Sequence, residues 1–413
     1  MIKLTDSLYF HNLNVGSRGL AQFWSNVNDQ YNEGGQFYID IGKRFRDNRF
    51  VSRNGDWSLP WSQSLIPGFE MPIYDPTFNK TFEQVSDQRA VEMKALIHQG
   101  QRLAVMYSGG MDSTSIMVAL LRNLTQDELE SVVVCASVHS ILENPVFWKN
   151  HINGKFKVID SVTNHYDDII LMGYRPITGD AGDCIFGTSI GLEMYHNFSY
   201  YVSKMRPALQ NKLWNLRFKI SDPEIHFSEY KEMIMYYLAY DTTPAGLNFG
   251  RLLYEKYAHN IRTASVPILS LHDFFWWLIF NVKYLNCSVR GPIFFNTEYP
   301  VKQCIDLIEN WFNGGEFQQW SMANNNTGEK IRNTLATYKY AMRKYIHDFD
   351  KNDWYFYFKT KLESLGNIPP SQVPAIAVVG IDTNYNLLDG FDSTVIEYFR
   401  HHLTNYTIDW TDN

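Results

Sequence analysis

Paired cysteines are missing from this sequence. Its four cysteines, Cys135, Cys184, Cys287 and Cys304, are scattered, and no two of them form a CxxC pair. Structural zinc sites and disulfide frameworks both depend on clustered or numerous cysteines. Their absence argues against both kinds of site and favours a reducing, cytoplasmic location.

Long apolar runs are missing as well. The first residues, MIKLTDSLYFHNLNVG, lack the apolar core of a secretion signal. The most apolar later stretch, FFWWLIF at 274–280, is far shorter than the roughly 20 residues that span a bilayer. We therefore expect a soluble protein with no membrane partner.

An excess of basic residues is also absent. The chain has 37 Lys and Arg against 44 Asp and Glu, a net charge of −7. Proteins that coat nucleic acid need basic excess, so a nucleic-acid partner is not expected, whereas a small anion held by local geometry is compatible with this charge. A length of 413 residues favours two domains.

Short apolar runs alternate with amphipathic stretches after residue 80. We predict a helix over 81–100, buried strands at 103–107, 131–138 and 155–162, and a helix over 113–124 between the first two strands. Residues 167–173 fit a strand or a short helix. This alternation predicts an α/β fold with a doubly wound, mainly parallel sheet.

The flanking regions have a different texture. Asn54-Gly55 between alternating stretches predicts a hairpin, so residues 1–80 are read as a small β-containing region and 81–413 as the main domain. The second half looks mostly helical, most clearly at 228–240, 271–282 and 301–312. Residues 313–330 look like a mobile loop, an active-site lid; the tail predicts a strand at 375–381 and a helix at 393–403.

The stretch YSGGMDSTS, 107–115, carries the clearest chemistry. Glycines between a strand and a helix let the backbone approach a phosphate, and the unsatisfied N–H groups of the first helical turn point at it. Ser108 and Ser113 can add hydroxyl donors, and Asp112 can hold a Mg²⁺ ion carried by the phosphates. Neither a GxxxxGK[ST] loop nor a GxGxxG fingerprint is present.

SGGMDS resembles the SGGxDS signature of the ATP pyrophosphatases, or PP-loop enzymes. Three later segments are similar, in the same order, to motifs of the asparagine synthetases and β-lactam synthetases: TGDAGDCIFG at 178–187, SVRGPIFF at 288–295 and YKYAMRKYI at 338–346. The resemblance covers roughly residues 85–350. It implies an amide ligase that uses ATP and Mg²⁺, adenylates a carboxylate, releases pyrophosphate and transfers the acyl group to an amine.

The resemblance also implies roles for single residues. Asp112 and Asp183 share the Mg²⁺ ion, and Lys339 neutralises charge on the α-phosphate or the leaving group, with Arg343 beside it on the same helical face. The residues implied to hold the nucleotide are Ser108, Gly109, Gly110, Asp112 and Ser113 at the phosphates, Gly179 in the second loop, and Ala136 and Val138 against the adenine.

Three departures from the family pattern matter. Asp180 replaces the glutamate that handles the incoming amine, which keeps a carboxylate on a shorter arm. Cys184 replaces a common glutamate, and we read it as a small buried residue. Position 2 is Ile2 rather than the nucleophilic cysteine of a glutaminase, and 80 residues are too few for that domain. The nitrogen must then come from free ammonia, a separate glutaminase subunit or another amine.

Two other interpretations stay open. The first is a PP-loop enzyme that amidates a carboxylated nucleobase or nucleotide. The second is a catalytically inactive ATP-binding scaffold, which the joint presence of Asp112, Asp183 and the glycines disfavours. The aromatic N-terminal region is compatible with a homo-oligomer interface. The carboxylate substrate cannot be read from the sequence, because no motif marks the residues that would select it.

Overall fold

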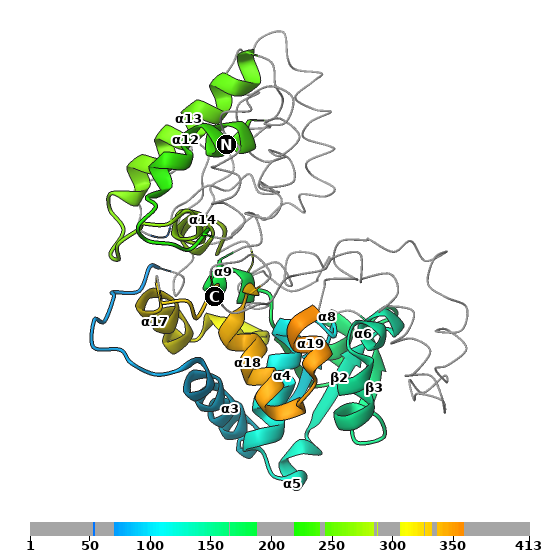
Figure 1. The fold of residues 1–413 in the computed structure, drawn as a ribbon. Coiled ribbons are helices and arrows are strands. Elements are labelled where there is room, and N and C mark those ends of the chain that lie inside the picture. The colour runs from blue at the N-terminus through cyan, green and yellow to red at the C-terminus, as the bar shows by residue number, and fades with distance from the viewer. Residues whose placement is uncertain are drawn as a thin grey trace, which may run out of the picture. The chain divides into compact units, whose positions relative to one another are not determined.

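The computed structural model describes residues 53, 70–164, 166–187, 219–239, 244–284, 287, 306–325, 327–332 and 337–358. The chain divides into two compact units made of interleaved segments. Unit 1 comprises 1–79, 181–303 and 315–340; unit 2 comprises 80–180, 304–314 and 341–413. The described helices and strands are drawn as a coloured ribbon in Figure 1. The predicted boundary at residue 80 stays a prediction.

Unit 2 is built on a five-stranded sheet with the order β3-β2-β1-β4-β5. All four strand pairs are parallel, as the predicted fold class requires. The strands are β1 (Arg102–Met106), β2 (Val132–Ala136), β3 (Lys157–Asp160), β4 (Tyr174–Thr178) and β5 (Glu309–Asn310). The α/β class and the parallel sheet are therefore confirmed, while membership of the PP-loop fold stays a prediction.

The strand sequences explain why these residues form a sheet. β2 reads VVVCA and is buried along its whole length, as expected of a strand covered on both faces. Three consecutive valines also favour the extended backbone. β1, RLAVM, has a buried centre and lies between β2 and β4. The sheet thus places its most apolar strands in the middle.

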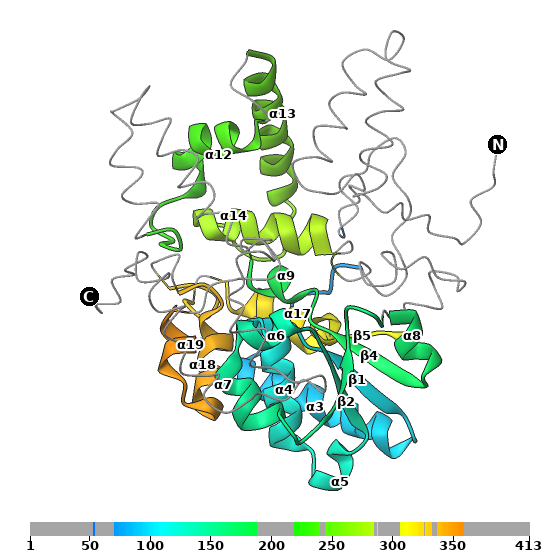
Figure 2. The ribbon, with the colours of Figure 1, turned by 90° about the vertical axis from the view of Figure 1, so that its right-hand side faces the viewer.

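The connections reverse direction next to β1. From β1 the chain moves outward to β2 and then β3, and it returns past them to place β4 on the other side of β1. Right-handed crossovers in opposite directions put their helices on opposite faces of a sheet. Accordingly, α4 (Met111–Asn123) and α8 (Tyr166–Leu171) lie on opposite sides of the strands (Figure 2).

The α8 face has its own apolar core. Ile169 of α8 is fully buried and packs with side chains that alternate along the neighbouring strands. These are Ala104, Val133, Cys135, Ile159 and Tyr174, with Met106 packed at the edge. The prediction for 167–173 left a strand and a helix open, and the structure resolves it as a short helix followed by β4.

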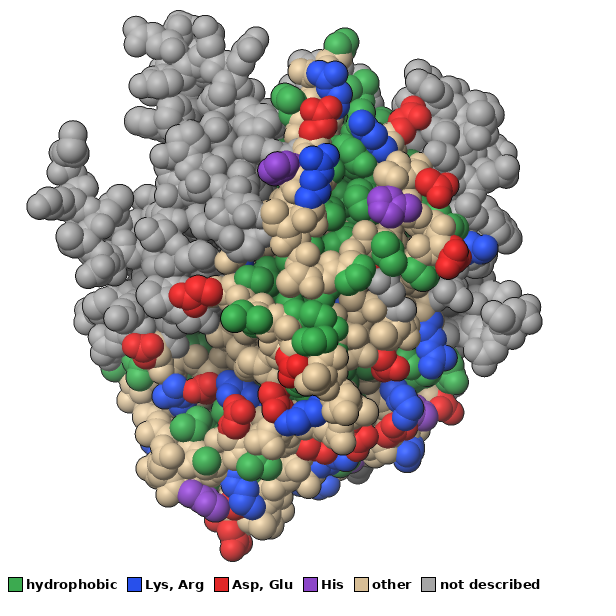
Figure 3. Space-filling view, turned by 90° about the vertical axis from the view of Figure 1, so that its left-hand side faces the viewer, with side chains coloured by type: hydrophobic (Ala, Val, Ile, Leu, Met, Phe, Trp, Pro, Cys, Tyr) green, Lys and Arg blue, Asp and Glu red, His purple; other side chains and the backbone are tan. Residues whose placement is uncertain are grey.

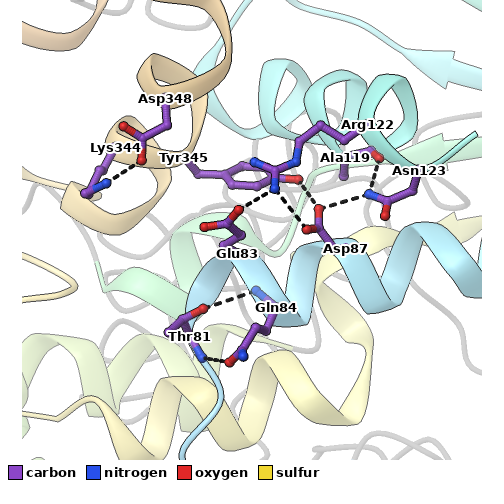
Figure 4. A network of polar contacts seen from close by, with 10 residues as sticks. All are labelled: Thr81, Glu83, Gln84, Asp87, Ala119, Arg122, Asn123, Lys344, Tyr345 and Asp348. Atoms are coloured by element: carbon purple, nitrogen blue, oxygen red, sulfur yellow. Dashed lines mark hydrogen bonds and ion pairs between the residues drawn. The ribbon is translucent and has the colours of Figure 1, made fainter.

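A polar network joins three helices of unit 2 (Figure 4). It links α3 (Phe82–His98), α4 and α18 (Tyr340–Asp350). Asp87 of α3 accepts hydrogen bonds from Tyr345 Oη at 2.7 Å and from Asn123 Nδ2 at 2.9 Å, and it pairs with Arg122 at 3.2 Å. The network ties the late helix α18 to the two early helices.

Shorter elements complete unit 2. They are α5 (Gln126–Leu129), α6 (Val138–Glu143), α7 (Pro145–Phe147), η1 (Trp148–Ile152), η5 (Trp311–Asn313) and α19 (Asp353–Phe358). The edge strand β5 is fixed by Glu309, whose carboxylate accepts hydrogen bonds from Arg89 at 2.8 Å and from Arg175 at 2.8 Å. Residues distant in the chain therefore close this side of the sheet.

Unit 1 is helical in its described part. Its elements are α9 (Gly182–Phe186), η3 (Phe227–Tyr230), α12 (Lys231–Leu238), α13 (Pro244–Ile261), α14 (Leu271–Leu278), η4 (Ile279–Lys283) and α17 (Gly315–Ala323). The FFWW cluster of α14 belongs to the core, because Trp276 and Trp277 are fully buried. Trp276 Nε1 donates to Ser321 Oγ at 2.8 Å, which links α14 to α17.

Two sequence predictions fail in the second half. Residues 313–330 are not one loop, because 315–323 form α17, whose Phe317 and Trp320 are buried. Burial of these apolar side chains stabilises a helix although the surrounding glycines and asparagines favour a loop. Residues 301–312 are not one helix, because Glu309–Asn310 pair with β4 as β5. The predictions for 375–381, 393–403 and the Asn54-Gly55 hairpin lie outside the described residues.

Among the side chains that are coloured by type in Figure 3, no large field of one charge sign is present. Basic and acidic side chains alternate there across the described residues. Among the same residues, no helix combines the length and apolarity that crossing a bilayer requires.

Candidate functional site

The loop between β1 and α4 is a tight turn that depends on glycine. Gly109 has φ +69°, in the left-handed region that side chains disfavour. A Cβ placed on it would lie well inside contact distance of the Ser140 carbonyl oxygen and 2.7 Å from Glu143 Cβ. The first turn of the loop is thus pressed against α6 and has no room for a side chain.

Serine hydroxyl groups of the loop form hydrogen bonds with its own backbone. The Ser108 N–H donates to Ser113 Oγ at 3.1 Å, and Ser113 Oγ donates to the Gly110 carbonyl at 3.2 Å. The Gly110 N–H donates to Ser108 Oγ at 3.3 Å. Ser113 is buried whereas Ser108 is exposed. Ser113 therefore holds the turn in shape, and its contact with phosphate stays a prediction.

The loop leads directly into the N-terminus of α4. Gly110 is the N-cap residue, and no side chain caps the helix there. The amide groups of an uncapped first turn, together with the helix dipole, form an anion-binding geometry. Asp112 lies in that same turn. Its carboxylate oxygen is the type of ligand that Mg²⁺ prefers beside phosphates.

The end of β4 lies beside this turn. β1 and β4 are adjacent, so the loops that follow them emerge together at the carboxyl edge of the sheet. A Cβ on Gly179 would lie only 2.9 Å from Asp112 Cβ. Asp180 follows at the same edge, partly exposed. Open parallel sheets bind ligands in this crevice, where the strand order reverses. The structure thus brings Gly179 and the SGGMDS loop together.

The predicted adenine-side residues follow the next strand. Ala136 is the last residue of β2 and is fully buried. Val138 begins α6, which Ser137 caps by accepting a hydrogen bond from the Ser140 N–H at 3.2 Å. The ends of β1, β2 and β4 therefore share one edge of the sheet. Contact of Ala136 and Val138 with adenine stays a prediction.

A second polar group lies in unit 1 around Asp183. Asp183 stands in the first turn of α9, and its side chain is 40% exposed. Its Oδ1 lies 2.8 Å from Lys339 Nζ and accepts a hydrogen bond from Tyr338 Oη at 2.9 Å. The Lys339 side chain is only 2% exposed, so this ion pair is largely shielded on the lysine side. The structure thus pairs two of the predicted site residues directly.

Lys339 does not share a helical face with Arg343, and that prediction is wrong. Lys339 has φ +60° and precedes α18, which begins at Tyr340. A left-handed lysine costs about 1–3 kcal/mol and is typical of constrained functional positions. Arg343 lies inside α18, buried, and its Nη1 donates to the Phe356 carbonyl at 2.8 Å. Arg343 therefore joins α18 to α19.

Cys184 is a buried core residue, as the sequence suggested. It is fully buried in α9. Burial raises the pKa of its thiol, and the neighbouring Cys287 raises it further. A thiol held protonated in this way is a poor nucleophile.

Two tyrosines of these sites carried no recognisable signal in the sequence. Tyr338 holds Asp183, as described above. Tyr355 of α19 donates from Oη to the Gly109 carbonyl at 3.1 Å, which places it directly behind the SGGMDS loop. Tyr338 stands beside Lys339 in the YKYAMRKYI segment, so it could have been noticed there. No local pattern distinguishes Tyr355 from the other aromatic residues of 353–358.

Asp112 and Asp183 each carry the type of ligand that a nucleotide-bound magnesium ion takes. No group of three His, Cys, Asp or Glu side chains gathers within the ranges that the structure describes. Mg²⁺ is commonly held by one or two carboxylates and completed by phosphate oxygens and water. Asp112 and Asp183 supply such ligands in type. Their sharing of one ion stays a prediction.

Of the four motifs that carry the family resemblance, the one at 288–295 lies outside the described residues. The other three motifs form local structures with a defined geometry. Comparison with models of protein families, with curated protein sequences and with solved structures found no match for this chain.

Proposed function

We propose that this protein is an amide ligase that activates a carboxylate with ATP and releases AMP and pyrophosphate. One observation supports this most directly. The glycine turn after β1 and the uncapped N-terminus of α4 lie where the strand order reverses, with Gly179 against Asp112. That position suits a nucleotide's phosphates in a parallel α/β sheet.

Each residue of this turn has a chemical role in the proposal. The backbone N–H groups at the start of α4 and the Ser108 hydroxyl bind the β- and γ-phosphates. Asp112 and Asp183 would hold Mg²⁺, which offsets the charge of the departing pyrophosphate. Preorganised donors of this kind stabilise a leaving group without reorganising during the reaction.

The reaction then has two steps. A carboxylate oxygen of the substrate attacks the α-phosphorus, the bond from that phosphorus to the bridging oxygen breaks, and pyrophosphate leaves. An amine nitrogen next attacks the acyl carbon, and the bond to AMP breaks. Asp180 takes a proton from the amine in this scheme. Lys339 offsets negative charge at the phosphates.

The test is exchange of labelled pyrophosphate into ATP, measured across a panel of carboxylates. Asp112→Ala removes the carboxylate in the first turn of α4. Asp127→Ala is the matched control, because Asp127 occupies the first turn of α5 and is exposed. We expect at least one carboxylate to drive exchange in the wild type and the control, and not in Asp112→Ala.

Product analysis with ammonium and the active carboxylate completes the test. AMP, pyrophosphate and an amide in equal amounts would establish the ligase. AMP and pyrophosphate without amide would retain the activation step and require a different amine. ADP with phosphate as the products, or the absence of ATP binding, would refute the proposal.

A further inference from the structure

A group of buried hydroxyls lies behind the SGGMDS loop, in unit 2. Tyr355 is 1% exposed, and its Oη donates to the Gly109 carbonyl at 3.1 Å. Tyr355 Oη also lies 3.3 Å from Thr114 Oγ1, which in turn donates to the Gly109 carbonyl at 3.4 Å. The Gly109 carbonyl therefore points into the protein and is held there by hydroxyl donors.

The direction of this carbonyl fixes the direction of the next amide. The described chain has no cis peptide bond, so the Gly109 C=O and the Gly110 N–H point in opposite directions. Since the carbonyl points inward, the amide points away from Tyr355. Its hydrogen-bond partner in the structure is Ser108 Oγ at 3.3 Å, and Ser108 is exposed. The peptide thus presents its donor on the outer side of the loop.

Hydrogen bonds fix the backbone of the helix that carries Tyr355. Its N–H donates to Asn352 Oδ1 at 3.1 Å, which caps the start of α19. Arg343 of α18 fixes the following turn by donating to the Phe356 carbonyl at 2.8 Å. Burial raises the pKa of the Tyr355 hydroxyl well above its ordinary value, so the group stays protonated and remains a donor.

We infer that Tyr355 is a positioning residue for the phosphate-binding loop. By holding the Gly109 carbonyl inward, it keeps the Gly110 N–H directed at the phosphate of the bound nucleotide. The inference rests on the proposed function, because it requires a phosphate at this loop. It assigns part of the site to a residue that lies 246 positions from its partner in the chain.

The test compares Tyr355→Phe with the wild type and with Tyr357→Phe. Tyr357 lies in the same helix, but its side chain is 37% exposed, so it is a matched control for losing a hydroxyl from α19. Calorimetry measures the affinities for inorganic pyrophosphate, for Mg-ATP and for adenosine. Adenosine has no phosphate, so it reports on the purine side of the site alone.

We expect Tyr355→Phe to weaken binding of pyrophosphate and ATP about three- to tenfold, the range of one hydrogen bond. Adenosine affinity should stay within about twofold, and Tyr357→Phe should change neither. Equal losses for adenosine and pyrophosphate would reveal a general structural role and overturn the inference. So would unchanged pyrophosphate affinity in Tyr355→Phe.

Failure of the proposed function gives a different result. A wild-type protein that binds neither pyrophosphate nor ATP refutes the phosphate site itself, before any variant is compared. If Tyr355→Phe does not fold, Thr114→Val removes the second hydroxyl beside the Gly109 carbonyl in an isosteric way. It should weaken pyrophosphate binding while leaving adenosine binding unchanged, and unchanged pyrophosphate binding would overturn the inference.

Discussion

Replacing Gly109 by alanine tests the geometry of the loop most directly. Two separate costs are expected. The first is the left-handed backbone at φ +69°, and the second is the close approach of the new Cβ to the Ser140 carbonyl and to Glu143. Gly154 separates these costs, because it also has φ +69° but nothing lies within 4 Å of its Cβ position. Both glycines belong to unit 2.

The magnitudes follow from these two differences. A left-handed alanine costs about 1–2 kcal/mol, partly offset by about 0.4–1 kcal/mol from the stiffer unfolded chain. Gly154→Ala should therefore lower the free energy of unfolding by about 1 kcal/mol or less. Forcing a methyl group against a backbone oxygen adds about 1–3 kcal/mol, as for other overpacked sites. Gly109→Ala should therefore lose about 1–4 kcal/mol in total, and more than Gly154→Ala.

Urea unfolding followed by circular dichroism measures both variants. Hydrogen exchange of the amides in β1 and α4 locates the loss, since these elements flank the loop. Gly109→Ala should also lose pyrophosphate binding, which Gly154→Ala should retain. Equal stability of the two variants would refute the reasoning, because it would mean that no atom of α6 crowds Gly109.

Three further predictions concern unit 1. Burial and then Lys330 lower the pKa of His272 to about 3, so only the unfolded state gains a proton as the pH falls below its ordinary value of 6.5. His272 should therefore lower the free energy of unfolding as the pH falls. His272→Gln should reduce the decrease in this free energy between pH 7 and pH 5 by about 2 kcal/mol, as measured by urea unfolding. An unchanged decrease would contradict this prediction. Tyr338→Phe should raise the Mg²⁺ concentration for half-maximal pyrophosphate exchange several-fold, because Asp183 loses the Tyr338 hydroxyl that orients its carboxylate, whereas an unchanged Mg²⁺ dependence would separate Tyr338 from the proposed metal site. Cys184 should resist iodoacetamide at pH 8 in the folded protein and react once unfolded, as mass spectrometry would show; rapid labelling of the folded protein would contradict its burial.

Local sequence patterns were sufficient for the centre of the sheet. β1, β2 and β3 coincide with apolar runs bounded by turn residues, and α4 begins at the predicted glycine turn. In each case the signal and the structure occupy the same few residues. The SGGMDS loop belongs to this group, because a glycine turn before a helix has local causes.

Local sequence patterns could not predict pairing between segments that are distant in the chain. β5 has only two residues, Glu309 and Asn310, and they become a strand because β4 offers them hydrogen bonds. Nothing in their own side chains favours a strand over a helix. Lys339 is a similar case: a helical pattern extended through it, whereas its ion pair with Asp183 accompanies a left-handed backbone. The sites likewise depend on tyrosines that only the folded chain brings into place.

The interleaving of the two units has a consequence for synthesis of the chain. The ribosome releases the SGGMDS loop, at 108–113, long before Glu309 and Tyr355. In a nascent chain that ends near residue 187, β4 is an edge strand that β5 does not yet pair with. Its unpaired backbone groups can then form hydrogen bonds with other chains. The Glu309 carboxylate, which pairs with both Arg89 and Arg175, is also missing from such a chain, although Arg89 pairs with Glu92 as well. The loop therefore reaches its final shape only after nearly all of the described chain has been made, and truncated products should aggregate rather than bind nucleotide.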